Sequence, residues 1–262
     1  YLMQKYSIFN LIKNAFASHQ KWDLAWKDAT PKKEYDAVII GGGGHGLATA
    51  YYLAKEHNIT NVAIIEKGWL GGGNMGRNTT IIRSNYMHDD NALFSEFGMD
   101  LWRKMSQDLN YNVMFSPRGI INLAHSDAQM NVFARRGNSM RLNGIDAVLL
   151  NREEVKEIIP MADFSDNVRF PIFGGLMQPS AGTARHDAVA WGYARQADSM
   201  GVDIIQNCEV TGFDVVSGKI QGVRTSRGDI KVKKIGLCVA GSTNILAEKL
   251  NMTIPVETHL LQ

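Results

Sequence analysis

The chain has 262 residues, of which 45% are hydrophobic and 21% charged, and these proportions are ordinary for a globular protein with a sizeable core. Its 28 basic and 26 acidic residues leave a formal net charge of +2, which gives no reason to expect binding to nucleic acid or to a membrane surface. Cys208 and Cys238 form neither a CxxC pair nor a Cys/His cluster, so we expect no metal site, two buried free thiols and, by default, a cytoplasmic location.

The first 34 residues, 1–34, are predicted to form a leader ahead of the folded domain. Apolar residues recur at helical spacing over Phe9–Ala17, which predicts a short amphipathic helix. Thr30–Glu34 is polar and contains a proline, as linkers do. Lys5 and Lys13 interrupt the apolar start of the chain and no small-residue cleavage site follows, so a signal peptide is not expected.

A glycine-rich turn between two apolar segments follows the leader. Tyr35–Ile40 and Asn61–Glu66 are short and apolar, which predicts two strands. Between them lie the turn Gly41–Gly46 and the segment Leu47–Glu56, whose small and apolar residues predict a helix. This order is that of a βαβ unit. Four consecutive glycines argue against a membrane helix over the uncharged stretch 37–54.

Beyond residue 92 the pattern changes to longer amphipathic segments. Helices are predicted over Ala92–Leu109, Asp127–Asn143 and Arg152–Ile158, and Phe115–Ala124 predicts an extended strand with a turn.

The last third of the chain contains short alternating strands after a helix predicted over Asp187–Met200. The predicted strands are Val202–Gln206, Glu209–Val216, Lys219–Thr225, Ile230–Lys233 and Lys234–Ala240. Ile254–Gln262 starts a further segment, so we expect the chain to be a C-terminally truncated part of a longer protein.

The glycine turn matches the pattern G-x-G-x-x-G at Gly41, Gly43 and Gly46. In that pattern the first glycine permits a tight turn, the second lets the backbone approach a pyrophosphate, and the third lets helix and strand pack closely. The N-terminus of the helix then offers N–H groups and a favourable dipole to the phosphates. Glu66 ends the second strand and can bind a pair of ribose hydroxyls. A glycine-rich turn in an unrelated α/β protein would leave this acid unexplained.

The loop after the acid indicates which dinucleotide is bound. Gly68–Ile81 is glycine-rich and polar, so its backbone N–H groups can wrap phosphates and the edge of a flavin ring. An NAD-binding protein would normally continue into another βα unit. The predicted dinucleotide is therefore FAD.

Two blocks of sequence carry a resemblance to a known family. The first is YDAVIIGGGGHGLATAYYLAKEHNITNVAIIEKGWLGGGNMGRNTTIIRSNY, and the second is GTARHDAVAWGYAR with the following VDIIQNCEVTGF. From about Met3 to Gln262 the chain resembles the D-amino-acid-oxidase-type family of flavoproteins. Within that family it is most similar to members that form one subunit of a four-subunit amine oxidase.

The resemblance implies an α/β fold in which a Rossmann-like FAD-binding domain is interleaved with an α+β substrate domain. The FAD-binding domain is expected over residues 35–91 and 175–253, and the substrate domain over 92–174 and again from 254–262. Family members close the FAD site with a C-terminal glycine-rich segment and carry a catalytic lysine near the flavin. We expect both beyond Gln262 and assign no catalytic residue within this chain.

The resemblance also implies which residues hold FAD without a covalent bond. Beyond the glycine pattern and Glu66, they are Gly44 and His45 in the phosphate loop, Asn74, Thr79 and Ile81 on the flavin side, and Val210 beside the adenine through its backbone. Arg77 lies in the same loop. Like Arg83, it can meet a phosphate or a substrate carboxylate, or it can be a solvated loop arginine.

His186 is the position that the resemblance assigns to a second, covalently bound flavin, FMN. A neutral imidazole nitrogen can add to the activated 8α position of a flavin that is held nearby. Among its neighbours, Arg185 offers positive charge and Asp187 can orient the imidazole. A surface histidine near the start of a helix fits the same residues. The resemblance favours covalent attachment of FMN.

The activity that the resemblance implies is flavin-dependent oxidation of sarcosine (N-methylglycine). The products would be glycine and formaldehyde, or methylenetetrahydrofolate when folate is bound, together with hydrogen peroxide. The flavins would supply this chemistry while the protein orients them. The implied partners are alpha, gamma and delta subunits. Oxidation of another N-methyl or D-amino acid, and a non-catalytic flavin-binding scaffold, are the alternatives.

Overall fold

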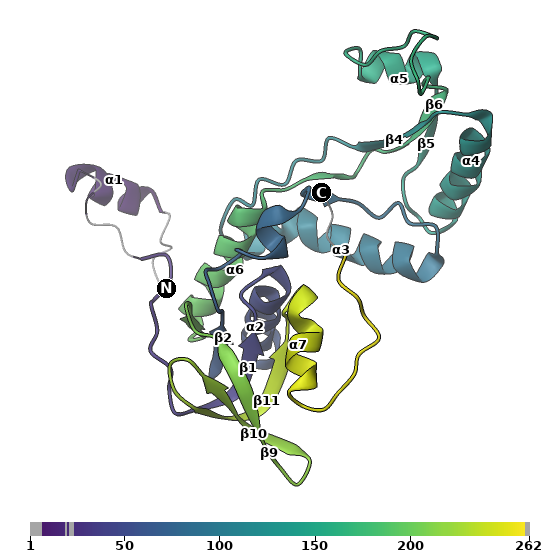
Figure 1. Cartoon of the computed structure of the whole chain (residues 1–262). Coiled ribbons are helices and arrows are strands. Elements are labelled where there is room, and N and C mark those ends of the chain that lie inside the picture. The colour runs from purple at the N-terminus through teal and green to yellow at the C-terminus, as the bar shows by residue number, and fades with distance from the viewer. Residues whose placement is uncertain (1–6, 19, 21–23, 260–262) are drawn as a thin grey trace. The chain divides into compact units, whose positions relative to one another are not determined.

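The computed structural model describes residues 7–18, 20 and 24–259 (Figure 1). The chain divides into unit 1, which comprises Tyr1–Trp69 and Ala194–Gln262, and unit 2, which comprises Leu70–Tyr193. The unit boundaries at 69/70 and 193/194 differ from the domain boundaries suggested by the sequence at 91/92 and 174/175. The assignment of FAD binding and substrate binding to particular domains stays a prediction. Parts of the predicted leader and of the segment 254–262 lie outside the described residues.

Unit 1 is built on a six-stranded sheet in the order β8-β2-β1-β11-β10-β9. Neighbours from β8 to β11 pair in parallel, and β10 and β9 extend the sheet as antiparallel strands. The strand β2 is buried along its full length, as expected for a parallel strand covered on both faces. The predicted α/β class is therefore confirmed. The strands are β1 (Glu34–Ile40), β2 (Val62–Ile65), β8 (Asp203–Ile205), β9 (Val210–Val216), β10 (Lys219–Thr225) and β11 (Ile230–Leu237).

The helix α2 (Gly44–His57) connects β1 to β2 and buries a face of small and apolar residues that includes Leu47 and Ala50. It begins at Gly44, not at Leu47 as predicted, because the extended residue Gly43 takes the N-cap position. It ends where Asn58 adopts a left-handed conformation with φ 53°. The βαβ unit predicted from the sequence is present, and Figure 1 shows α2 beside β1 and β2.

The later part of unit 1 differs from prediction in two places. Ile230–Leu237 is one strand and not two, because it pairs with β10 at its start and with β1 along its length. The chain then turns through a short 3-10 helix, Ala240–Ser242, into the unpredicted helix α7 (Thr243–Glu248). The predicted amphipathic helix near the N-terminus is present as α1 (Ile8–Phe16), and its apolar side chains are exposed.

Unit 2 contains a three-stranded antiparallel sheet, β4-β6-β5, and a two-stranded pair, β3-β7. The helices α4 and α5 lie against the central strand β6. Of these strands only β4 was predicted, and it is shorter than Phe115–Ala124 because Gly119 interrupts the extended run with φ 81°. The bounds are β3 (Ile81–Ile82), α3 (Asp89–Asp108), β4 (Ile120–Ala124), α4 (Asp127–Leu142), β5 (Val148–Asn151), α5 (Arg152–Ile158), β6 (Gly174–Gln178) and β7 (Gly182–Thr183). The helix α6 (His186–Ser199) runs from unit 2 into unit 1.

The described residues contain no helix with the length and apolar character needed to cross a membrane. The same residues hold no cluster of three or more His, Cys, Asp or Glu side chains suited to a metal ion. Both cysteines are free thiols: Cys208 is buried as predicted, whereas Cys238 is only half-buried. Burial raises the pKa of the Cys238 thiol, and a hydrogen bond with Thr49 partly offsets this rise.

Truncation of a buried side chain in β2 tests the importance of the unit 1 core. Ile64 is fully buried in β2, so Ile64→Ala should lower the free energy of unfolding by about 2 to 5 kcal/mol through lost burial and the cavity left behind. Val216 is 60% exposed at the end of β9, so Val216→Ala is the matched control. It should change the free energy of unfolding by less than about 0.5 kcal/mol. Urea unfolding followed by circular dichroism measures both. Equal stability of the two variants would contradict this description of the core.

Candidate functional site

The turn that follows β1 requires glycine at its first position. Gly41 has φ +109°, a conformation that side chains rarely adopt, and a Cβ there would lie 2.3 Å from the carbonyl oxygen of Cys238. The Gly41 N–H donates to the carbonyl of Ile65 at 2.8 Å, which holds the turn against the end of β2. The turn is therefore tight and fixed to two neighbouring strands.

The start of α2 approaches this turn more closely than any side chain allows. A Cβ at Gly46 would lie 1.9 Å from the carbonyl oxygen of Gly41. At Gly43, in contrast, a Cβ would meet nothing within 4 Å, and this N-cap residue makes no side-chain cap. The first N–H groups of α2 therefore face open space beside Gly43, with the positive end of the helix dipole behind them. That arrangement suits a phosphate or pyrophosphate.

Glu66 follows β2 and bridges two loops with its carboxylate. Its Oε2 accepts from the N–H of Gly42 and its Oε1 accepts from the N–H of Gly68, both at 2.8 Å. The sequence predicted the acid at the end of the strand but not these backbone bonds. A carboxylate has about four acceptor positions, so two remain for the hydroxyls of a ribose.

The loop from β8 to β9 is bonded to the same acid-bearing segment. The Glu66 N–H donates to the carbonyl of Ile205, and the N–H of Cys208 donates to the carbonyl of Glu66, both at 2.9 Å. Val210, predicted beside an adenine, is buried at the start of β9 opposite Thr225. His45 is exposed in the first turn of α2, where its carbonyl accepts from the Thr49 hydroxyl at 2.7 Å. Unit 1 thus gathers the glycine turn, Glu66 and this loop at the C-terminal ends of parallel strands, where ligands bind in such folds.

The remaining predicted residues belong to unit 2. Asn74 and Arg77 bound a single 3-10 turn and are exposed, as is Thr79. Ile81 begins β3 and pairs with Thr183 of β7, three residues before His186 in the sequence. The pairing of β3 with β7 therefore brings the predicted flavin-side loop close to the segment that leads into α6.

His186 is the first residue of α6, and its Nδ1 is buried with no hydrogen-bond partner among the described residues. Asp187 does not orient the imidazole as the sequence suggested. Its carboxylate instead accepts from Arg185 Nε at 2.9 Å and Nη2 at 2.8 Å, and from the Ala188 N–H at 2.8 Å. Burial acts to raise the pKa of Asp187, but these hydrogen bonds and the charges of Arg185 and His186 outweigh it and lower that pKa.

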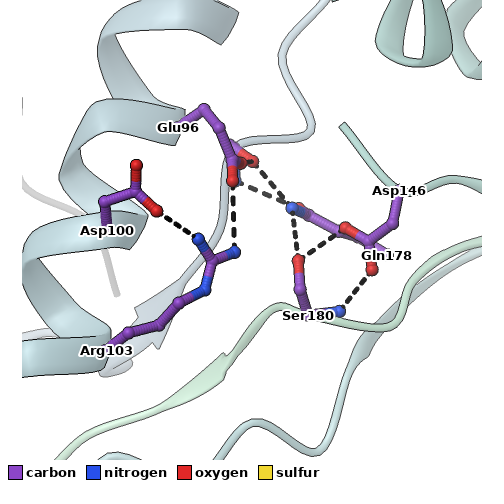
Figure 2. Close-up of polar contacts among 7 residues, drawn as sticks. Glu96, Asp100, Arg103, Asp146, Gln178 and Ser180 are labelled. Carbon is purple, nitrogen blue, oxygen red and sulfur yellow. Dashed lines mark hydrogen bonds and ion pairs between the residues drawn. The ribbon is translucent and has the colours of Figure 1, made fainter. Parts of the chain in front are cut away.

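A polar cluster in unit 2 was not predicted (Figure 2). The fully buried Gln178, at the end of β6, donates from Nε2 to the Ser84 hydroxyl at 2.7 Å, and that hydroxyl donates to Glu96 Oε2 at 2.6 Å. Nearby, Ser180 donates through its hydroxyl to Asp146 Oδ1 at 2.5 Å and through its N–H to Oδ2 at 2.6 Å. These partners satisfy one another, so the cluster fixes the segment after β3 to the end of β6.

Comparison with known proteins agrees with this geometry. A family model described as FAD dependent oxidoreductase matches residues 36–262. The chain is 55% identical over 258 residues to sarcosine oxidase subunit beta of Rhizobium meliloti (strain 1021), covering 98% of this chain and 62% of that protein. It is 52% identical over 240 residues to sarcosine oxidase subunit beta of Arthrobacter sp, covering 92% of this chain and 59% of that protein. The chain thus spans about three fifths of the length of these relatives.

A solved structure shows the same fold. The chain resembles L-proline dehydrogenase from P. horikoshii with a TM-score of 0.78 and 26% sequence identity, over 85% of this chain and 57% of that one.

Substitutions at two glycines distinguish an effect on ligand binding from an effect on folding. A side chain at Gly43 meets open space, so Gly43→Val should retain the fold, at a cost of about 1 kcal/mol for a poor N-cap residue. The valine should fill the space of the pyrophosphate and weaken FAD or ADP binding on the order of a hundredfold, about 2.7 kcal/mol. Gly46→Val should instead lower the thermal midpoint, because its Cβ overlaps the Gly41 carbonyl. Calorimetric titration measures the affinity of each variant for FAD or ADP, and thermal melts measure its stability. Tight FAD retention by Gly43→Val would exclude this turn as the phosphate site.

Proposed function

Because this chain belongs to the family of FAD-dependent oxidoreductases, we propose that it is the flavin-binding part of the beta subunit of a sarcosine oxidase. The observation that carries this proposal is the 55% identity to sarcosine oxidase subunit beta over 98% of the chain. The reaction would oxidise sarcosine to glycine and formaldehyde, with reduction of O2 to hydrogen peroxide. When tetrahydrofolate is bound, methylenetetrahydrofolate would form in place of formaldehyde.

FAD would be held by the glycine turn and Glu66 of unit 1. When bound, it supplies an acceptor for two electrons from the substrate. The N–H groups at the start of α2, including those of Gly44 and His45, would donate to the pyrophosphate. Glu66 would accept from the ribose hydroxyls with the two acceptor positions that Gly42 and Gly68 leave open. The backbone of Val210 would contact the adenine.

Asn74, Arg77, Thr79 and Ile81 would contact the flavin end of FAD. These residues are exposed, so their side chains are accessible to a ligand. Arg77 in this role would place a positive charge near a phosphate.

His186 would be the attachment site of a covalently bound FMN, through a bond between a ring nitrogen and the 8α-methyl carbon of the flavin. The unpartnered, buried Nδ1 supports this role, because a buried ring nitrogen without a hydrogen bond is costly and rare. The close pair between Arg185 and Asp187 leaves the imidazole free of that carboxylate. The Asp187 carboxylate therefore does not occupy either ring nitrogen.

The assembly would contain alpha, gamma and delta subunits besides this one. The relatives are called subunit beta, which supports an enzyme of several different chains. The residues that contact the substrate would lie in the part of the relatives that this chain does not cover, which is 38% (100% minus 62%) of the Rhizobium meliloti protein. Two free thiols support a reducing, cytoplasmic setting.

A second candidate is oxidation of another secondary amino acid. The likeness to L-proline dehydrogenase, at a TM-score of 0.78, favours it, because proline and sarcosine are both secondary amines with a neighbouring carboxylate. The two candidates share the FAD site and differ in the substrate pocket.

Turnover by the intact enzyme distinguishes these candidates. The protein, produced with its partner subunits, should consume oxygen and release hydrogen peroxide and formaldehyde with sarcosine. L-proline and N-methyl-L-alanine should give values of kcat/KM lower by at least about tenfold, since each adds carbon atoms that a sarcosine pocket excludes. A preference for L-proline would support the second candidate, and no oxidation of any of the three amines would contradict both.

Removal of the imidazole tests the covalent flavin. Acid precipitation of the wild-type complex should give a yellow pellet, and mass spectrometry should find FMN on the peptide that contains His186. His186→Ala should release FMN yet retain FAD, because the glycine turn and Glu66 are untouched. The control is His88→Ala, which alters an exposed histidine at the N-cap of α3 that makes no side-chain cap. A colourless wild-type pellet with an unmodified His186 peptide would rule out this attachment.

A further inference from the structure

The helix α1 is specified by its local sequence and yet buries none of its residues. Ser7 takes the N-cap position, where its hydroxyl accepts from the N–H of Asn10 at 3.2 Å. Lys13 lies in the last turn, where a positive charge suits the helix dipole. The structure describes all nine residues of α1, and none of them is buried. A helix of this length is only marginally stable in water without further packing.

One side of α1 is apolar along its whole length. Successive residues of an α-helix are about 100° apart, so the apolar residues fall on one side and Asn10, Lys13 and Asn14 on the other. Asn10 and Asn14 are half-buried, whereas the large apolar side chains are between 49% and 89% exposed. These exposed side chains form the apolar face of α1 and comprise Ile8, Phe9, Leu11, Ile12 and Phe16.

The apolar face of α1 suits a groove in a protein better than a membrane surface. Helices that bind in apolar grooves place anchors at positions i, i+3 and i+7, and Phe9, Ile12 and Phe16 have this spacing. Helices that lie on membranes carry several lysines or arginines on the polar side. In α1 that side has a single positive charge, Lys13, between two asparagines.

The matches to known proteins indicate which protein supplies the groove. The match to sarcosine oxidase subunit beta of Rhizobium meliloti leaves out 2% of this chain, which is about five residues of 262, so it includes α1. The match to monomeric sarcosine oxidase of Arthrobacter sp. (strain TE1826) leaves out 13%, which is about 34 residues. The family model begins at residue 36 and leaves out the whole leader. The helix α1 is therefore shared with a relative that is a subunit and lies outside the general family model.

The same matches argue against a groove on the remainder of the same subunit. This chain covers 62% of the Rhizobium meliloti protein and 57% of the monomeric protein, so both relatives have a further part of similar share. A helix needed to cover that further part would be expected in both. Between them, the relative whose name implies partner chains is the one whose match includes α1.

Two contacts hold the leader beyond α1 to unit 1. The Lys27 N–H donates to Asp198 Oδ1 at 3.0 Å, and Lys32 Nζ pairs with Asp203 Oδ2 of β8 at 2.6 Å. A partner that binds α1 would therefore be linked through the leader to the edge of the unit 1 sheet, which raises its effective concentration there.

We propose that α1 docks in an apolar groove on a different subunit of the enzyme, with Phe9, Ile12 and Phe16 as its anchors. The inference rests on the proposed function, in which this chain is one of several in the enzyme, and it names the segment that binds a partner. The groove would be lined by aliphatic and aromatic side chains, because it must cover an apolar face with no charged group.

Photo-crosslinking identifies the occupant of the groove. The intact subunit is produced with its partner subunits and carries Phe16→p-benzoylphenylalanine, at the most exposed position of the apolar face. Irradiation should give a covalent link to a peptide of a different subunit, identified by mass spectrometry. The same group at Asn14, on the polar side, is the matched control and should give little of this product. A link within the subunit itself, a link to a second copy of it, or no link to protein would overturn the inference.

Dilution of the purified enzyme measures what α1 contributes to assembly. Ile12→Gln combined with Phe16→Gln keeps residues of good helix propensity and removes two anchors. Dissociation, followed by mass photometry, should then begin at a concentration on the order of a hundredfold higher, because two apolar side chains no longer leave water on binding. Asn14→Gln should leave it unchanged. Since α1 buries no residue, the variant subunit should melt at the same temperature as the wild type.

The outcomes separate this inference from the function on which it rests. If the wild type forms no enzyme with other chains, the proposed function fails and the inference fails with it. If the enzyme forms and oxidises sarcosine, but the double variant dissociates at the same concentration as the wild type, only the inference is overturned. Wild-type subunit that sediments with vesicles of phosphatidylcholine and phosphatidylserine, while the double variant does not, would overturn it in favour of a membrane.

Discussion

The close approach of α2 to the end of β1 determines the rest of the candidate site. Gly46 and the Gly41 carbonyl leave no room for a side chain, so the helix can start directly above the strand only with glycine at this position. That start aims the first N–H groups of α2 at the open space beside Gly43. The dipole and these N–H groups together favour a phosphate at one end of the parallel sheet. Neither the strand nor the helix alone would produce such a site.

The carboxylate of Glu66 both holds this arrangement in place and offers acceptors to the ribose. Its carboxylate accepts from backbone N–H groups on both sides, at Gly42 in the turn and at Gly68 in the next loop. One side chain therefore fixes the distance between the phosphate turn and the ribose position. The β8–β9 loop is bonded to the same residue through the N–H of Cys208.

Sequence patterns predicted the parts of this site that depend on local spacing. The glycine pattern, the flanking strands and the acid all occur within residues 35–66, so their order was sufficient to predict the βαβ unit. Interactions between distant residues left no such signal. The bond between Ser84 and Gln178 joins residues 94 positions apart, and β3 and β7 are two-residue strands, too short to show any alternation. Because Asp187 is next to His186 in the sequence, it was predicted to orient the imidazole. The long side chain of Arg185 reaches the Asp187 carboxylate and donates two hydrogen bonds to it instead.

The central claim is that the adenosine half of FAD lies on the glycine turn and on Glu66, and a crystal structure of the intact protein with FAD tests it most directly. The account predicts pyrophosphate oxygens within hydrogen-bond distance of the first N–H groups of α2, and ribose hydroxyls on the carboxylate of Glu66. A pyrophosphate bound away from this turn, or a Glu66 carboxylate that touches no ribose hydroxyl, would contradict it.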